Sequence, residues 1–173
     1  LAGCQNNDEN EQHYDNKLFI SASNFTKEIL FKAGDTNVET GLSVAIAKPE
    51  EHDIKVTMSP APELLSTYKL AYYDETAVLL SEEHYSMPET STTIKSGSIV
   101  SPELPIEFIN TGELDIKTTY VLPVTIKSVE GIGVLQSAKT YYYVFRGASL
   151  INVVCNISRN RAYPDFKNDS KFN

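Results

Sequence analysis

Short segments in which hydrophobic and polar residues alternate with a period of two run along the chain from Lys17 onward, separated by Gly, Pro, Asn and Asp. This alternation is typical of half-buried β-strands, because successive side chains of a strand point to opposite faces. Six or seven such strands over about 130 residues favour an all-β fold, an antiparallel sandwich of two sheets. The alternating segments are 29–31, 42–46, 54–58, 104–108, 120–126 and 141–145.

Two proline-containing segments interrupt the strand pattern. Pro62 stands where a helix can begin, and Leu64 and Tyr68 follow at helical spacing. We therefore expect one short helical crossing between strands at 62–69. Pro123 lies inside a strand pattern, where it removes a backbone donor from the ladder. The strand around it is expected to be an edge strand or to carry a bulge at that position.

The composition is that of a folded domain with an acidic surface. Of the 173 residues, 41% are hydrophobic and 22% are charged, which is normal for a globular protein. The formal net charge of −8 argues against nucleic acid or an anionic membrane surface as the main partner, since both attract basic proteins. No run of about 18 apolar residues occurs in the sequence, so it offers no transmembrane helix.

The N-terminus reads Leu1-Ala2-Gly3-Cys4 and continues into a polar, acidic stretch. These four residues resemble the lipobox at the end of a bacterial lipoprotein signal peptide, in which the cysteine thiol takes a lipid. The resemblance implies a membrane anchor on Cys4, with residues 1–16 as lipobox remnant and acidic flexible tether. The acidic stretch resembles the surface-export signal of Bacteroidetes lipoproteins, which implies an outer-membrane protein that faces the cell exterior. The alternative is that the four residues meet by chance.

The second cysteine, Cys155, lies in the apolar alternation at 151–157 and is expected to be a small buried hydrophobe. A disulfide between Cys4 and Cys155 is the alternative, and a lipid on the Cys4 sulfur would forbid it. The three histidines are His13, His52 and His84. They are scattered without metal-ligand spacing, so we expect neither a metal site nor a cofactor.

Five segments, in a fixed order, carry a resemblance to a known domain family. In order and approximate spacing they are similar to domain-of-unknown-function family 1735 of Bacteroidetes lipoproteins. The resemblance covers roughly residues 17–147 and implies an immunoglobulin-like sandwich over that range. The segments are DIKVTMSP at 53–60, LLSTYK at 64–69, YSMP at 85–88, TIKSG at 93–97 and TYVLPVTI at 119–126.

The same resemblance implies an N-terminal position in surface lipoproteins that are encoded with glycan-utilisation systems. A laminin-G-like or other concanavalin-like domain often follows, and in some members a family-18 endoglycosidase barrel does. Residues 148–173 are accordingly expected to be a linker and the first strand of a truncated second domain. The alternative is that their apolar segment is a final strand of the sandwich itself.

Two clusters combine carboxylates with a histidine, at 50–53 and 82–84. Each is expected to be a solvated turn, and a metal or acid–base site is the alternative. Glycoside hydrolysis needs two carboxylates set across a bond by a rigid scaffold, and the spaced Asp/Glu strand motif of family-18 enzymes does not occur in the sequence. No nucleophile elbow or phosphate-binding glycine loop occurs either. We therefore expect this chain not to be an enzyme.

Neighbouring tyrosines offer rings on which a carbohydrate site could place the apolar side of a sugar. The pair Tyr72 and Tyr73 and the triplet at 141–143 place adjacent rings on opposite faces of a strand or turn, so at least one ring in each set should point away from the core. Tyr142 is the first candidate for carbohydrate binding, with Tyr72 and Tyr73 after it. The alternative for Tyr142 is an ordinary cross-strand aromatic on the solvent face, and the absence of tryptophan weakens the carbohydrate interpretation.

Three functions follow from these features. The first is a non-catalytic spacer and glycan-capture module of a surface lipoprotein, with glycans and other surface glycan-utilisation proteins as partners. The second is an accessory domain of an endo-β-N-acetylglucosaminidase-type glycoside hydrolase whose catalytic residues lie beyond Asn173. The third is a structural adhesin or pilus-type subunit that pairs an exposed strand edge with another chain.

Overall fold

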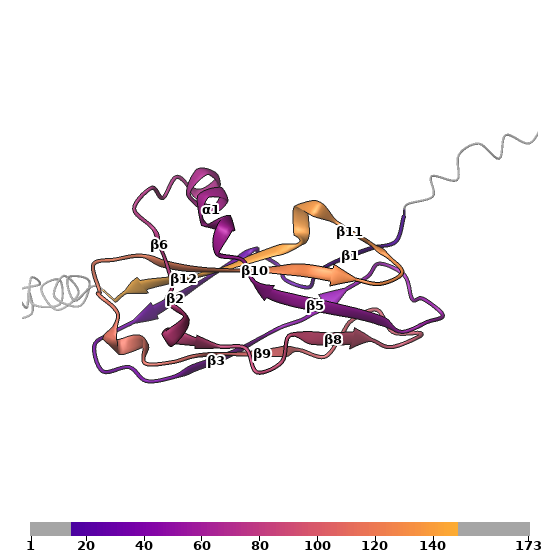
Figure 1. Cartoon of the computed structure of the whole chain (residues 1–173), viewed down its shortest axis with the longest axis horizontal. Coiled ribbons are helices and arrows are strands. Elements are labelled where there is room, and N and C mark those ends of the chain that lie inside the picture. Colours follow the sequence, from indigo (N-terminus) through magenta and orange to yellow (C-terminus); the bar gives the residue numbers. More distant parts are fainter. Residues whose placement is uncertain (1–14, 149–173) are drawn as a thin grey trace, which may run out of the picture.

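The alternating segments form the strands of a two-layered β-sandwich (Figure 1). The computed structural model describes residues 15–148. One short helix lies outside the larger layer, on the face away from the core. The elements in chain order are β1 (Lys17–Ile20), β2 (Thr26–Phe31), β3 (Val38–Leu42), β4 (Val44–Ala45), β5 (Ile54–Pro60), η1 (Pro62–Leu64), α1 (Leu65–Tyr72), β6 (Val78–Leu79), η2 (Glu82–His84), β7 (Tyr85–Ser86), β8 (Ser91–Ile94), β9 (Leu104–Phe108), η3 (Thr111–Glu113), β10 (Tyr120–Val129), β11 (Gly133–Val134), η4 (Gln136–Ala138) and β12 (Thr140–Gly147).

The larger layer is a sheet in the order β2-β12-β10-β5-β8, with β6 paired to the first residues of β10. The opposite layer contains β3-β9-β7, and a short sheet of β11-β1-β4 lies toward the end at which the described chain begins (Figure 1). Most neighbouring strands are antiparallel, but β2 pairs with β12, β6 with β10 and β1 with β11 in parallel. The predicted all-β, immunoglobulin-like sandwich with one helical crossing is confirmed.

The core fills the space between the two layers. In β5, the buried residues Ile54, Val56 and Met58 alternate with residues that face outward, and β9 shows the same alternation. Each apolar side chain that is fully buried in this way stabilises the fold by roughly 1.5–3 kcal/mol. The largest aromatic side chains of the core are Phe31, Phe108, Tyr143 and Phe145.

The predicted helical crossing is present on the outer face of the larger sheet. Pro62 opens the 3-10 turn η1, a position where its missing N–H removes no intrahelical hydrogen bond. The helix α1 then continues past the predicted end at Lys69 to Tyr72. Tyr73 ends it in the left-handed conformation, with φ 54°. The only residue of α1 that is fully buried is Tyr68, which packs against the sheet and anchors the helix there.

Pro123 lies in the middle of the larger sheet, so the expectation of an edge strand is wrong. β10 has β12 on one side and β6, followed by β5, on the other. The register shift of β10 falls between Ile126 and Ser128, so no bulge is at the proline either. The Pro123 carbonyl accepts a hydrogen bond from the Ala61 N–H at 2.9 Å. In a strand, the nitrogen of a residue points to the same side as its carbonyl, so the Pro123 nitrogen also faces the β6 and β5 side of β10. The missing N–H therefore lies at the gap between β6, which ends its pairing at Val121, and β5, which begins its pairing at Val124.

The described chain begins and ends at opposite ends of the long axis of the sandwich (Figure 1). β1 starts near one end, and β12 runs out at the other. Within residues 15–148, no helix is long and apolar enough to cross a membrane. The expected anchor on Cys4, the thiol of Cys155 and nearly all of the expected linker at 148–173 lie outside the described residues.

Candidate functional site

The three consecutive tyrosines of β12 divide between two faces, as the alternation predicts. Tyr141 and Tyr143 belong to the central core, whereas Tyr142 belongs to a second apolar cluster on the outer face of the sheet. The helix α1 covers Tyr142 there and leaves 8% of the residue exposed. This first candidate for carbohydrate binding therefore lies on the expected face but beneath a helix.

Of the two other candidates, the fold brings Tyr72 to Tyr142 and leaves Tyr73 apart. Tyr72 is the last residue of α1, so it belongs to a helix and not to the strand or turn that the sequence suggested. Its ring centroid lies 6.0 Å from that of Tyr142, and Tyr68 stacks on it at 4.9 Å with 29° between the ring planes. Tyr68 also lies 5.3 Å from Tyr142, which completes a group of three rings. Tyr73 is 93% exposed and lies outside this group.

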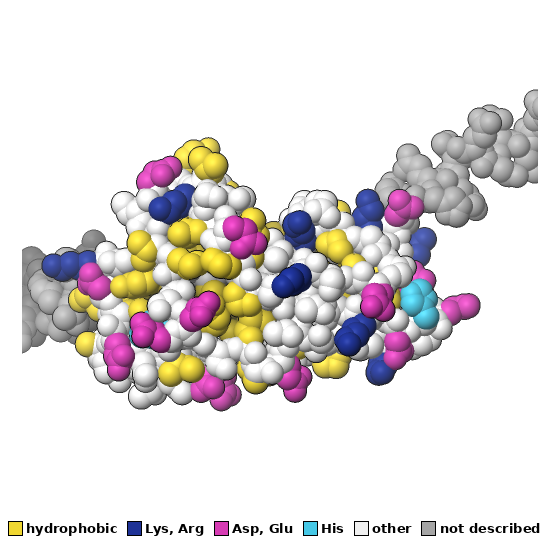
Figure 2. Space-filling view, viewed as in Figure 1, with side chains coloured by type: hydrophobic (Ala, Val, Ile, Leu, Met, Phe, Trp, Pro, Cys, Tyr) yellow, Lys and Arg dark blue, Asp and Glu magenta, His cyan; other side chains and the backbone are white. Residues whose placement is uncertain are grey.

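A hollow of about 220 Å³ opens beside the three rings, and we call it the tyrosine hollow. The strand register explains its polar side. Val144 and Arg146 follow Tyr142 on the same face of β12, and the parallel edge strand β2 sets Glu28 opposite Val144. Hydrophobic side chains gather on α1 and on the sheet below it (Figure 2). The hollow is lined by Thr26, Glu28, Tyr68, Tyr72, Val144 and Arg146.

Arg146 connects Glu28, which lines the tyrosine hollow, with Asp74, which does not line it. Its Nε lies 3.4 Å from Glu28 Oε2, and its Nη2 donates to Asp74 Oδ2 at 3.3 Å. Burial raises the pKa of the Tyr68 phenol, and the negative charge of Asp74 raises it further. Burial also raises the pKa of Tyr142, so both phenols keep their protons at neutral pH.

Sequence reasoning missed the charged members of this site. The position of Arg146 was predictable, because a residue four positions after Tyr142 in a strand lies on the same face. The positions of Glu28 and Asp74 were not predictable from local sequence, since they reach Arg146 only through the parallel pairing of β2 and the crossing of α1. Long-range folding therefore assembles the polar part of the hollow.

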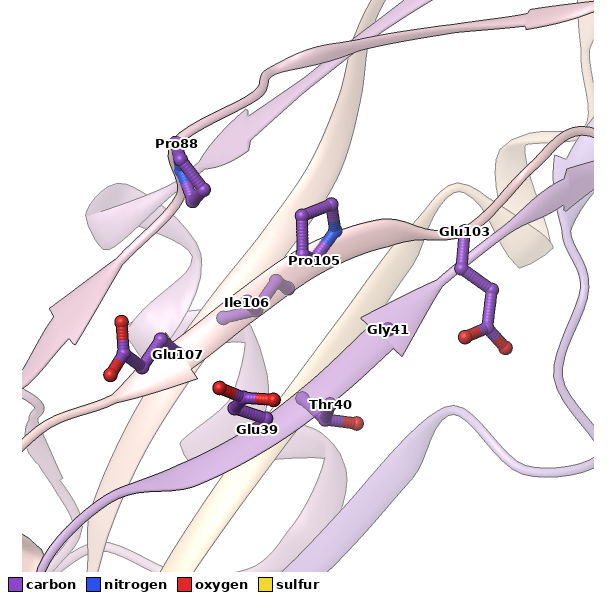
Figure 3. A pocket seen from close by; sticks show the side chains of 8 residues that line it. All are labelled: Glu39, Thr40, Gly41, Pro88, Glu103, Pro105, Ile106 and Glu107. Atoms are coloured by element: carbon purple, nitrogen blue, oxygen red, sulfur yellow. The ribbon is translucent and has the colours of Figure 1, made fainter.

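A second hollow, of about 560 Å³, lies over β3 and β9, and we call it the acidic hollow (Figure 3). Glu39 and Glu107 occupy directly opposite positions on the paired strands. Figure 3 shows Glu103 apart from these two glutamates, near Gly41. The Glu103 side chain lies so close to Gly41 that a Cβ atom on residue 41 would collide with it. Asn37 Nδ2 donates to Glu107 Oε1 at 2.7 Å. Pro88 and Pro105 complete the walls, so this hollow offers three carboxylates and little aromatic surface.

The two carboxylate–histidine clusters serve local structure in the arrangement seen. His84 is buried, and its Nδ1 lies 3.1 Å from the Ile109 carbonyl oxygen. Asp53 accepts hydrogen bonds from Lys95 Nζ at 2.8 Å and from the Ser96 N–H at 2.9 Å, and these lower its pKa. Across residues 15–148, no three His, Cys, Asp or Glu side chains come together in a way that could hold a metal ion.

Comparison with known proteins finds a matching family model and solved structures of similar fold. Residues 14–133 match the model of a family described as an N-terminal domain. No curated protein matches the sequence. A Bacteroides ovatus structure described as a "putative carbohydrate binding protein" is similar with a TM-score of 0.67 and 18% identity, over 75% of this chain and 36% of that one.

Two further structures from Bacteroides share the fold. EndoBT-3987 of Bacteroides thetaiotaomicron, solved with a Man5GlcNAc product, is similar with a TM-score of 0.62 and 19% identity, over 75% of this chain and 30% of that one. A Bacteroides ovatus multidomain protein including DUF1735 has a TM-score of 0.53 and 21% identity, over 74% of this chain and 42% of that one. The chain thus spans less than half of each of these three structures. At identities of 18–21%, the similarity shows a shared sandwich fold.

Proposed function

Because the chain belongs to the family of N-terminal domains of the domain-of-unknown-function 1735 type, we propose that it is a non-catalytic module that holds the glycan-handling part of a surface lipoprotein away from the membrane. The observation that carries this proposal is the path of the chain, which enters the sandwich at one end of its long axis and leaves at the other (Figure 1). A domain threaded in this way adds its length to the distance between whatever precedes and follows it. The ten residues of β10 alone span about 33 Å.

The link to glycans comes from the proteins that share the fold. One is described as a "putative carbohydrate binding protein", and another was solved with a Man5GlcNAc product. In both, the part that matches this chain is about a third of a longer protein. A module that accompanies a glycan-handling region explains this arrangement, and other surface glycan-utilisation proteins are the partners that it would bring together.

The attachment to the membrane is assigned to a lipid on Cys4. Each buried methylene of an acyl chain contributes roughly 0.8 kcal/mol, so several chains on one residue give stable anchoring. The polar residues between Cys4 and β1 then act as a tether that lets the sandwich stand off the outer membrane and face the exterior.

A pair of cysteine variants of the full-length precursor tests the anchor. Cys4→Ala should lose incorporation of labelled fatty acid and leave the membrane fraction, whereas the matched control Cys155→Ala should keep both. Protease added to whole cells should cleave the control and the wild type, because both face the exterior. Retention of Cys4→Ala in the membrane would refute the anchor. Failure of the full-length protein to bind any glycan on an array would refute the glycan role.

A second candidate is favoured by the similarity to EndoBT-3987. In this case the module would present the catalytic domain of an endo-β-N-acetylglucosaminidase-type hydrolase to its substrate. The full-length protein should then release glycans from a glycoprotein, as seen by mass spectrometry of the products. Release of nothing, combined with glycan binding, would leave capture as the function.

A further inference from the structure

The ring of Tyr72 is prepared for a flat, apolar ligand. Tyr68 stacks on it at 4.9 Å, and Tyr142 meets it nearly edge-on, with 72° between the ring planes. These two contacts leave 44% of Tyr72 exposed, beside the hollow that it lines. A ring that is already held by two neighbours loses little conformational freedom when a ligand arrives. Its remaining surface can take the apolar side of a sugar ring.

The charged residues beside Tyr72 offer both kinds of hydrogen-bonding group. Arg146 is held by Glu28 at 3.4 Å and by Asp74 at 3.3 Å, but a guanidinium has five N–H donors and these contacts use two nitrogens. Arg146 approaches Glu28 through one carboxylate oxygen, Oε2, and Glu28 is 57% exposed. Each hydroxyl of a sugar both donates and accepts, so a carboxylate next to a guanidinium suits two neighbouring hydroxyls.

Size and charge define the ligand class. About 220 Å³ has room for one sugar ring but not for a buried oligosaccharide. Two carboxylates, Glu28 and Asp74, surround one guanidinium, so an acidic sugar would be repelled. We propose that the tyrosine hollow binds one pyranose ring of a neutral saccharide, with Tyr72 against its apolar side and Glu28 and Arg146 on its hydroxyls. This inference rests on the proposed function for the presence of a glycan, and it adds the site and the sugar class.

Saturation-transfer NMR on the 173-residue chain tests the site. The probes are neutral methyl pyranosides of mannose, glucose, galactose and N-acetylglucosamine, their short oligomers, and methyl glucuronide as the acidic comparator. At least one neutral probe should bind, and methyl glucuronide should bind less well than the neutral probe that binds best. Absence of binding by every neutral probe at millimolar concentration would overturn the proposal, as would binding of methyl glucuronide as tight as that of the best neutral probe.

Variants then locate the binding. Tyr72→Ala should weaken it at least about tenfold, while Tyr72→Phe should preserve it because the ring and not the hydroxyl makes the contact. Tyr73→Ala is the matched control, since this neighbouring tyrosine is 93% exposed and outside the hollow. Glu28→Gln, on the surface strand β2, should weaken binding without affecting the helix. Equal loss in Tyr73→Ala, or no loss in both Tyr72→Ala and Glu28→Gln, would place the sugar elsewhere.

The outcome separates this inference from the proposed function. If the full-length protein binds glycans but the 173-residue chain does not, the site is wrong and the module remains a spacer. If Cys4→Ala stays in the membrane while the tyrosine hollow binds a sugar, the anchor is wrong and the site stands.

Discussion

The two outer faces of the sandwich each carry a hollow, and the hollows differ in how their polar groups are held. In the tyrosine hollow, Arg146 lies between Glu28 and Asp74, beside three packed rings. In the acidic hollow, Glu39 and Glu107 occupy opposite positions on paired strands, and neither forms an ion pair within residues 15–148. The acidic hollow is the larger, at about 560 Å³ against 220 Å³.

The contacts that fix the walls favour the tyrosine hollow as a binding site, whereas volume alone would favour the acidic hollow. A ligand in the tyrosine hollow meets a ring and a guanidinium that neighbouring residues already hold, so little ordering remains to be done. A ligand in the acidic hollow would have to order the exposed side chains of Glu39 and Glu103 and offset the repulsion between Glu39 and Glu107. The source of the contrast is α1, which covers one outer face, while no α-helix within residues 15–148 lies over β3 and β9 (Figure 1).

The sharpest way to break the comparison is to remove the side chain that joins the helix to the sheet. Tyr68 is 2% exposed, and Tyr68→Ala should lower the free energy of unfolding by about 3 kcal/mol because it empties the space beneath α1. Urea unfolding followed by circular dichroism measures this. Tyr73→Ala and, on the other face, Glu39→Ala should each stay within about 0.5 kcal/mol of the wild type. A loss below about 1 kcal/mol for Tyr68→Ala would mean that the helix is not held through this residue.

Alkaline pH should weaken the fold through its buried tyrosines, and Tyr68 and Tyr142 beside the tyrosine hollow are two of them. Burial raises the pKa of Tyr142, and for Tyr68 burial and then the charge of Asp74 do the same. The folded state therefore keeps protons that the unfolded chain releases near pH 10, so the free energy of unfolding should fall as the pH rises above about 10. Tyr142→Phe has no proton to lose at this position and should show a shallower fall. Unfolding curves at pH 8 to 11 measure the slope, and an unchanged slope in Tyr142→Phe would contradict the assignment.

Periodicity alone located much of this architecture. The alternation at 54–58, 104–108 and 141–145 marked β5, β9 and β12, because one face of each strand packs in the core. It also placed Tyr142 on the face opposite Tyr141 and Tyr143, and Pro62 marked the start of the helical crossing. These features are local, since each depends on residues within one element.

The rest depends on contacts between distant parts of the chain. Asp74 and Arg146 are 72 residues apart, and no local pattern indicates that they pair. The alternation in β12 shows which way Tyr142 points but not that α1 will cover it. Pro123 misled for the same reason, because the break between β6 and β5 that accommodates it is a property of the assembled sheet. The sequence therefore predicted the face on which Tyr142 lies, but it did not predict the charged residues beside the three rings or the helix that covers Tyr142.

The smallest expected effects have opposite signs on the two faces. Arg146→Gln should destabilise the fold by about 0.5–1 kcal/mol, because Asp74, only 15% exposed, loses its cation, while solvent screens the more exposed pair with Glu28. Glu107→Gln should stabilise it by about 0.2–0.5 kcal/mol, since it removes a like charge opposite Glu39 and keeps an acceptor for Asn37. Both changes should shrink in 1 M salt, where the Debye length is about 3 Å. Thermal unfolding at low and high salt measures both changes in the free energy of unfolding. If both substitutions destabilised the fold, or both stabilised it, the proposed difference in charge balance between the two hollows would be wrong.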